Sequence, residues 1–293
     1  MSVAIPLRAF LDQAHDRHAT TPQAVADGLA ARAAALPCDD EGAEAVRLAE
    51  HVMLGHLADP SGLRRFVQAL PQALRGAREG ACAEAVGRVS WALAQLEAAG
   101  GERGAIMLAD ALRWRALQNV VLARVASGHV PAAAQALRDA EPAAAAHADN
   151  TARQAYAACA NNVAQHLRDG PRGDADREVL MIEAATIARR AWQRAGTWQH
   201  VERADYQLAL CHAALGHGAL ALDHARACLA ACEAEGADAA ERFFAHEACA
   251  HAARAAGDQP AVAAQRTRMQ ALLDEIADPQ MRAWCAQTLA ALP

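Results

Sequence analysis

The chain has 293 residues, of which 54% are hydrophobic and only 4% aromatic, and it carries a formal net charge of −6. This length is enough to bury a large core. All 28 lysine-or-arginine positions are arginine, which excludes mechanisms that need a lysine, such as Schiff-base chemistry. The negative net charge, with both signs interspersed, argues against nucleic-acid binding.

The composition favours a bacterial, cytoplasmic protein. Arginine in place of every lysine is typical of a GC-rich genome. The first residues lack a basic start followed by a long apolar core, so no signal peptide is predicted, and no run of about 18 apolar residues predicts a membrane span. The eight cysteines are scattered through helix-like runs, and in the cytoplasm we expect them to be free, buried thiols.

Helix signals follow one another along the whole chain, whereas period-2 runs of β-branched and aromatic residues are missing. Prolines such as Pro22 and Pro60 mark helix starts, and glycines such as Gly128 and Gly216 mark helix ends. The pattern predicts an all-α protein of about fourteen antiparallel helices. They are expected at 5–18, 22–36, 41–58, 61–78, 81–99, 103–127, 131–147, 151–169, 174–195, 199–215, 218–235, 238–256, 260–276 and 279–291.

A repeated sequence phrase organises the chain after residue 100. Three times a helix-like run ends in a small residue plus glycine and restarts on an alanine-rich run, at Gly128, Gly216 and Gly257. The last two glycines are 41 residues apart, a period that indicates stacked helical pairs. We therefore predict repeats in 101–293 and a less regular N-terminal portion in 1–100, joined in one stack. Residues 169–176 form the clearest predicted loop.

Aligned on their glycines, the phrases share spaced positions that are clearest at Leu208, Ala209, His212, Gly216, Ala221, Cys228 and Leu229. This spacing resembles the tetratricopeptide repeat, in which small residues let the two helices of a pair cross closely. The likeness is weaker in 104–140, 150–195 and 237–276, and faint before residue 100. The resemblance implies a right-handed superhelical solenoid of antiparallel helix pairs; another helical solenoid is the alternative.

The resemblance also implies a concave groove lined by the first helix of each pair. Asn119, Asn162 and Gln207 share one aligned position, and amides carry both a donor and an acceptor for a peptide backbone. Arg115 and Arg203 share the position four residues earlier and are expected to hold carboxylates. Alternatively, the amides contact neighbouring helices and the arginines are solvated. The predicted groove residues are Arg115, Asn119, Asn162, Gln165, Arg203, Tyr206, Gln207 and His251.

Several histidine and cysteine residues are candidate metal ligands. His246 and His251 are five residues apart, as are His51 and His56, and five residues of α-helix leave two rings about 140° apart. Only a π-bulge would align them. The group His224, Cys228 and Cys232 shares one helix face but spans about 12 Å, too far for one zinc ion to bind all three. The alternative is a site made of two of them and a residue from another helix, such as Cys211 or His212. We therefore predict no metal site, no cofactor and no catalytic residue.

The sequence thus favours a helical-repeat adaptor that binds a protein or peptide segment, with or without acidic groups, in its groove. It favours neither an enzyme nor a membrane or nucleic-acid partner. A sensor or assembly component of a bacterial regulatory system is one alternative, and a metalloprotein that uses the histidine and cysteine groups is another. The five tryptophans are assigned to the core or to contacts between repeats. The pattern specifies no oligomeric state.

Overall fold

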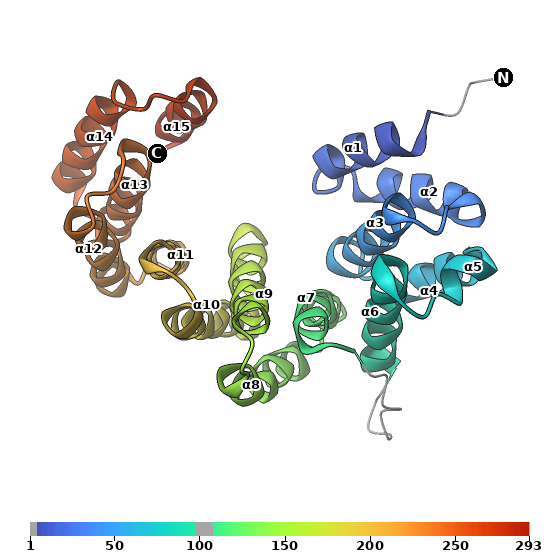
Figure 1. Cartoon of the computed structure of the whole chain (residues 1–293). Helices are drawn as coiled ribbons and strands as arrows, with labels where there is room; N and C mark the ends of the chain where they lie inside the picture. Colours follow the sequence, from blue (N-terminus) through green and yellow to red (C-terminus); the bar gives the residue numbers. More distant parts are fainter. Residues whose placement is uncertain (1–4, 98–107, 293) are drawn as a thin grey trace. The chain divides into compact units, whose positions relative to one another are not determined.

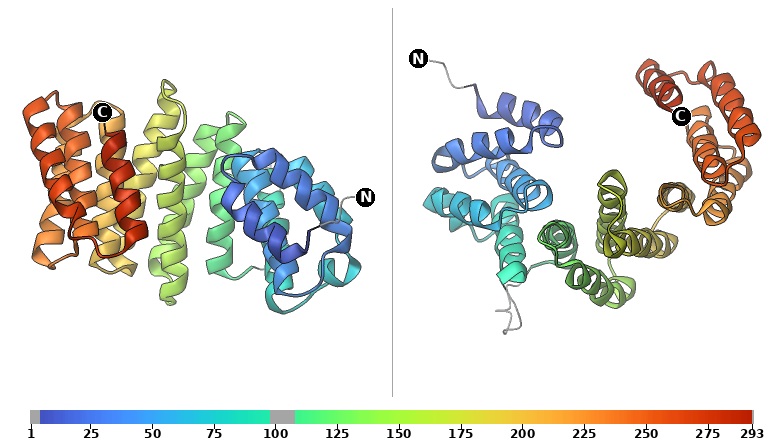
Figure 2. Two further views of the ribbon diagram at one scale, coloured as in Figure 1. Left: turned by 90° about the horizontal axis from the view of Figure 1, so that it is seen from above. Right: turned by 180° about the vertical axis from the view of Figure 1, so that it is seen from behind.

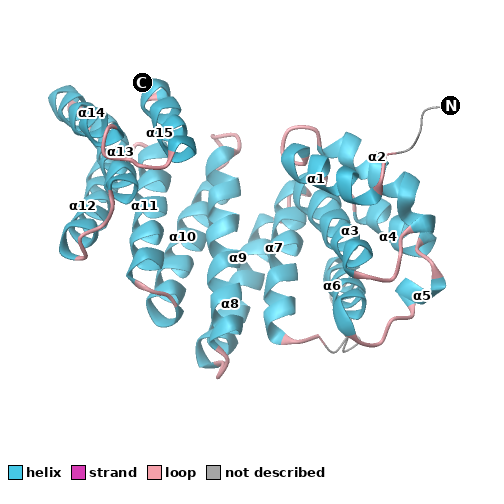
Figure 3. Cartoon of the chain, turned by 45° about the horizontal axis from the view of Figure 1, so that its top comes forward, coloured by secondary structure: helices cyan, strands magenta, loops and turns pink. Residues whose placement is uncertain are grey.

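The computed structural model describes residues 5–97 and 108–292. Within these ranges every element is a helix and no strand occurs, which confirms the predicted all-α class (Figure 3). The described residues form fifteen α-helices, close to the fourteen expected. No helix of the described residues is both long and apolar enough to cross a bilayer. The boundary expected near Gly100 and Gly101 lies outside the described residues.

The chain divides into two compact units, Met1–Cys159 and Ala160–Pro293, and the division falls within helix α9. Unit 1 contains the helices up to the first half of α9, and unit 2 contains the remainder (Figure 1). The helices that begin in unit 1 are α1 (Leu7–Arg17), α2 (Pro22–Arg32), α3 (Asp40–Glu50), α4 (Pro60–Ala69), α5 (Gln72–Arg75), α6 (Gly80–Glu97), α7 (Asp110–Ala126), α8 (Val130–Ala146) and α9 (Asn150–Asp169). Those of unit 2 are α10 (Ala175–Ala195), α11 (Trp198–Ala214), α12 (Gly218–Ala234), α13 (Ala239–Ala255), α14 (Gln259–Leu273) and α15 (Pro279–Ala291).

Local signals account for most helix boundaries. The Asp59 carboxylate accepts a hydrogen bond of 2.7 Å from the Gly62 amide and so caps α4, whose first residue is a proline. At the other end, Gly216 and Gly257 follow α11 and α13 with φ of +72° and +76°, a left-handed conformation that favours glycine. The repeated phrase in the sequence is therefore a repeated helix end.

Two expected helices of unit 1 are interrupted. The helix expected at 61–78 is divided at Pro71 into α4 and α5, which explains the extra helix. The helix expected at 41–58 changes type: α3 continues into the short π-helix η2 (His51–His56), which ends before Ala58. Ala58 has φ of +49° and is the only described residue other than glycine with a positive φ. The expected helix at 22–36 likewise closes with a 3-10 turn, η1 (Ala33–Ala35).

Small side chains permit close packing in unit 2. Ala209, Ala221 and Ala248 are fully buried between α11, α12 and α13, where short side chains let helix axes approach. Each helix from α10 to α15 packs against the next along the chain, and α13 also packs against both α11 and α15. The result is two layers within this unit, α11, α13 and α15 in one and α10, α12 and α14 in the other (Figures 1 and 2).

Candidate functional sites

An aromatic row crosses one layer of unit 2. Tyr206 on α11 and Phe244 on α13 meet edge to face with ring centroids 6.3 Å apart, and Phe244 and Trp284 on α15 are 5.0 Å apart. Trp284 is 55% exposed, whereas Phe244 and Tyr206 are half-buried. The three residues are 38 and 40 residues apart in the sequence, and α11, α13 and α15 contribute one ring each.

Polar groups flank this aromatic row on both sides. One turn before it, the exposed Arg203 guanidinium forms an ion pair with Glu241. One turn after it, the Tyr206 hydroxyl donates a hydrogen bond of 2.9 Å to Glu247, and the His251 Nε2 atom lies 3.7 Å from the same carboxylate. Burial and the Glu247 charge raise the pKa of the Tyr206 phenol, which therefore remains a donor. This face can thus offer apolar, cationic and anionic contacts together.

A buried carboxyl group lies in the same layer, at Glu202 on α11. Its Oε1 atom accepts a hydrogen bond of 2.6 Å from the Cys228 thiol and lies 3.7 Å from the Cys232 sulfur, while its Oε2 atom has no partner. Burial raises the pKa of Glu202 to about 7. The hydrogen bond from Cys228 lowers this pKa, but by less than burial raises it. The two cysteines of the group weighed as metal ligands are thus donors to a carboxyl group.

The third member of that group, His224, has a separate partner. Its Nδ1 atom lies 2.8 Å from the Asp205 carboxylate, which also accepts a hydrogen bond of 2.7 Å from Arg189. Burial alone would raise the pKa of Asp205, but these two contacts lower it below its usual range. His212 stacks on His224 with ring centroids 5.7 Å apart. Burial, and to a smaller extent the neighbouring His224 and His217, lower the pKa of His212 to about 4.

The remaining predicted groove residues of unit 2 fall into two groups. Asn162 and Gln165 on α9 are exposed, as a ligand-binding role requires. Gln207 is only 5% exposed, and its side-chain oxygen accepts a hydrogen bond of 2.8 Å from Arg168. The Gln207 amide therefore links α11 to α9, as in the alternative that the sequence left open. Gln207 could reach a ligand only by giving up its contact with Arg168.

The two predicted residues of unit 1 also differ from each other. Arg115 on α7 is exposed. Asn119 on the same helix is only 2% exposed, and its amide nitrogen donates a hydrogen bond of 2.9 Å to Glu50 on α3. Glu50 is fully buried and pairs with Arg88 at 3.1 Å. Burial raises the pKa of Glu50, whereas Arg88 and Asn119 oppose that rise. Asn119 thus belongs to a buried polar network in this structure.

Three histidines converge beside that network. His18 follows α1, and His51 and His56 are the first and last residues of η2. One ligand nitrogen from each ring lies within 4.8 Å of the other two, and all three residues are half-buried. The ring centroids are 4.8 to 5.3 Å apart, and every pair of rings meets edge to face. Among the described residues this is the one group of three or more histidine, cysteine or acidic residues with such spacing.

The expectation that His51 and His56 lie on different helix faces is wrong. It assumed α-helical geometry, whereas these residues form a π-turn in which the Leu57 amide donates to the Val52 carbonyl, 3.0 Å away and five residues earlier. The π-turn brings the two Nε2 atoms to 3.2 Å. The pair with the same spacing on α13 remains in a regular α-helix, where His246 lies 2.7 Å from Gln265 instead.

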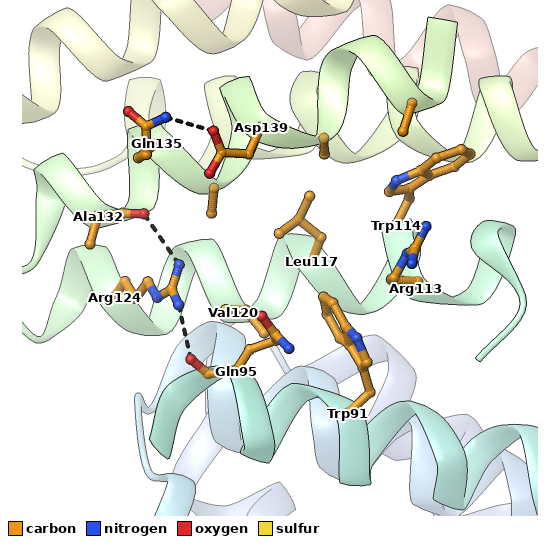
Figure 4. Close-up of a pocket in the computed structure, with 13 residues that line it drawn as sticks. Trp91, Gln95, Arg113, Trp114, Leu117, Val120, Arg124, Ala132, Gln135 and Asp139 are labelled. Atoms are coloured by element: carbon orange, nitrogen blue, oxygen red, sulfur yellow. Dashed lines mark hydrogen bonds between the residues drawn. The ribbon is translucent and has the colours of Figure 1, made fainter. Parts of the chain in front are cut away.

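A pocket of about 450 Å³ opens between α6, α7 and α8 of unit 1 (Figure 4). Trp91 and Trp114 line one end, and Arg124 lines the other (Figure 4). The Arg124 guanidinium donates hydrogen bonds of 2.9 and 3.2 Å to the carbonyl oxygens of Gln95 and Ala132. Its cationic group therefore holds three helices together, and the pocket wall combines apolar side chains with polar ones such as Gln135 and Asp139.

Comparison with protein-family models, with curated proteins and with solved structures gives no match for this chain. The sites above therefore rest on the chain's own geometry. The sequence interpretation missed Phe244, Trp284 and His18. The regular spacing of the aromatic residues could have indicated the row, but no local signal connects His18 with residues 33 and 38 positions later.

Proposed function

We propose that the protein is a helical-repeat adaptor that binds a segment of another protein across α11, α13 and α15. The aromatic row Tyr206–Phe244–Trp284 is the observation that carries this proposal. Aromatic side chains are enriched at protein interfaces, where their large apolar surface is buried against a partner. Trp284 is 55% exposed, and a partner that covered it would gain the free energy of burying this apolar surface.

The chemistry of this face defines the kind of segment that fits. An apolar or aromatic side chain of the segment would cover Trp284 and Phe244, and a carboxylate would compete with Glu241 for the exposed Arg203 guanidinium. Asn162 and Gln165 supply further exposed amides in the same unit. We infer that the protein binds a partner and does not catalyse a reaction. We also propose a cytoplasmic location, which is supported by the eight cysteines, all of them free thiols.

The decisive comparison uses matched tryptophan and leucine variants. The natural partner would be captured by cross-linking in the source cell, and its affinity for purified protein measured by calorimetry. Trp284→Ala should weaken binding roughly 10- to 100-fold, the range of a central interface residue. Leu220→Ala is the control, because Leu220 is 50% exposed but lies on α12 in the opposite layer.

A charge variant tests the second feature of the face. Arg203→Ala should weaken binding of an acidic segment more at low salt than at high salt, because the lost contact is ionic. Wild-type affinity in both Trp284→Ala and Phe244→Ala would show that the segment does not bind here. The identity of the captured partner also separates a general adaptor from an assembly component of a regulatory system.

A further inference from the structure

We propose that His18, His51 and His56 form a three-histidine site for a divalent transition metal, with zinc as the ion that the geometry fits best. The Nε2 atoms of His51 and His56 are 3.2 Å apart. Two nitrogens bound at about 2.0–2.1 Å to one tetrahedral zinc ion are separated by about 3.4 Å. The third nitrogen lies within 4.8 Å of both, so a small shift of an imidazole at the end of α1 completes the set.

The hydrogen bonds of two rings place the proton on Nδ1 and leave Nε2 unprotonated. The His18 Nδ1 atom lies 2.6 Å from the His15 carbonyl oxygen, which can only accept, so Nδ1 carries the proton and Nε2 is unprotonated. A neutral imidazole that donates from one nitrogen and binds metal through the other is the usual arrangement of a histidine ligand.

The tautomer of His51 is set by a longer chain of contacts. Asn119 must direct its NH2 group to the Glu50 carboxylate, so its Oδ1 atom faces His51 Nδ1 at 3.3 Å. This oxygen accepts the Nδ1 proton and leaves Nε2 with the lone pair. Arg88 in turn fixes Glu50 by an ion pair at 3.1 Å. The buried position of the Asn119 amide thus has a purpose in the metal site, as an outer contact that orients a ligand.

The backbone of η2 is shaped for this convergence. A Cβ atom on Gly55 would lie 3.1 Å from Asn119 Oδ1 and 3.5 Å from His51 Nδ1, so glycine leaves room for the orienting hydrogen bond. Ala58, two residues after the end of η2, has φ of +49°, a conformation that costs an alanine roughly 1–2 kcal/mol. π-Helices are rare in proteins as a whole, but those that occur often lie at functional sites. Strained residues cluster at such sites as well.

The donor set indicates how the ion would be used. Imidazole suits zinc, copper, nickel and iron in preference to magnesium or calcium. Three protein ligands leave one tetrahedral position for water or for a donor from a partner molecule. All three histidines are half-buried, so the cluster is partly exposed to solvent.

The test is a zinc titration of the metal-free full-length protein in competition with a chromophoric chelator. We expect saturable binding of one Zn²⁺ per chain, and a loss of at least about 100-fold in affinity for each of His18→Ala, His51→Ala and His56→Ala. His15→Ala is the matched control: it removes an exposed imidazole from the same helix but keeps the backbone carbonyl that orients His18.

Two further measurements exclude a folding artefact and an alternative location. Gly55→Ala leaves every ligand in place and should weaken zinc binding roughly 10-fold by disturbing the Asn119 contact. Wild-type protein loaded with Co²⁺ should show tetrahedral visible bands without a thiolate charge-transfer band. A thiolate band, no saturable binding below about 100 μM, or unchanged affinity in the three histidine variants would show that the histidines form a hydrogen-bonded cluster only.

Discussion

The buried carboxyl group of Glu202 leads to a prediction about stability and pH. Its pKa is about 7 in the folded protein, compared with an ordinary value of 4.5. The folded state therefore binds this proton more tightly than the unfolded chain does. At a pH between these two pKa values, the folded state binds more protons at this group than the unfolded chain does. The group therefore makes stability fall as pH rises from about 4.5 to about 7.

The magnitude follows from the difference between the two pKa values. Because the pKa differs by about 2.5 between the folded and unfolded states, this group lowers the free energy of unfolding by about 3 kcal/mol above pH 7. Glu202 is only 2% exposed, so solvent does little to screen this effect. The groups that face it are Cys228 and Cys232 on α12, Glu241 on α13 and the adjacent Arg203, of which only the arginine favours the ionised form by charge.

Glu202→Gln should remove this dependence. The variant is expected to match the wild type at about pH 4.5 and to exceed it by up to about 3 kcal/mol at about pH 8, because a neutral amide needs no deprotonation. Urea denaturation followed by circular dichroism at several pH values gives the difference. Glu235→Gln is the control, since Glu235 is exposed at the end of the neighbouring α12.

The free energy of unfolding of the variant must be compared with that of the wild type at each pH, because His212 changes the pH dependence of stability in the opposite direction. Its lowered pKa of about 4 means that the unfolded chain binds more protons between about pH 4 and 6.5, so this group makes stability rise with pH there. The two slopes partly cancel in the wild type. A Glu202→Gln variant whose advantage is the same at about pH 5 and pH 8 would refute the reasoning.

Two other predictions concern packing and thiol reactivity. A Cβ atom on Gly218 would lie 2.7 Å from the Ala256 backbone, so Gly218→Ala should destabilise by about 1–3 kcal/mol in thermal melting, whereas Gly87→Ala, whose nearest contact is a side chain at 3.4 Å, should be neutral or slightly stabilising. All eight cysteines are free and only Cys38 is exposed, so a thiol reagent should label one thiol quickly in native protein and eight in denaturant. Burial raises the pKa of Cys211 to about 12, which slows its reaction further; several fast native thiols would contradict this packing.

The sequence alone located the helices because their ends depend on residues only a few positions apart. Asp59 with Pro60 starts a helix, and Gly216 ends one, through contacts within the same turn. The order of large and small residues likewise predicted stacked antiparallel pairs. Even the spacing of Tyr206, Phe244 and Trp284 was visible in the sequence, although only the packing of α13 against α11 and α15 brings the three rings together.

Tertiary structure decided which polar positions are buried. Alignment on the turn glycines treated Asn119, Asn162 and Gln207 as equivalent, but they have different surroundings. Glu50 on α3 captures Asn119, Arg168 on α9 holds Gln207, and Asn162 remains exposed. Helix periodicity specifies the face of a helix that carries a residue, and it contains no information about a partner about 70 residues away.

The histidine cluster depended most on tertiary structure. A spacing of five residues places His51 and His56 on different faces of an α-helix, and this was the sequence expectation. The π-helix η2, which is followed by the strained Ala58, brings the two rings together instead. The end of α1 adds His18 from 33 residues earlier. A π-turn is less favourable than an α-helix for the local sequence alone. It persists here because contacts from α1 and α7 are made only when the whole unit has folded.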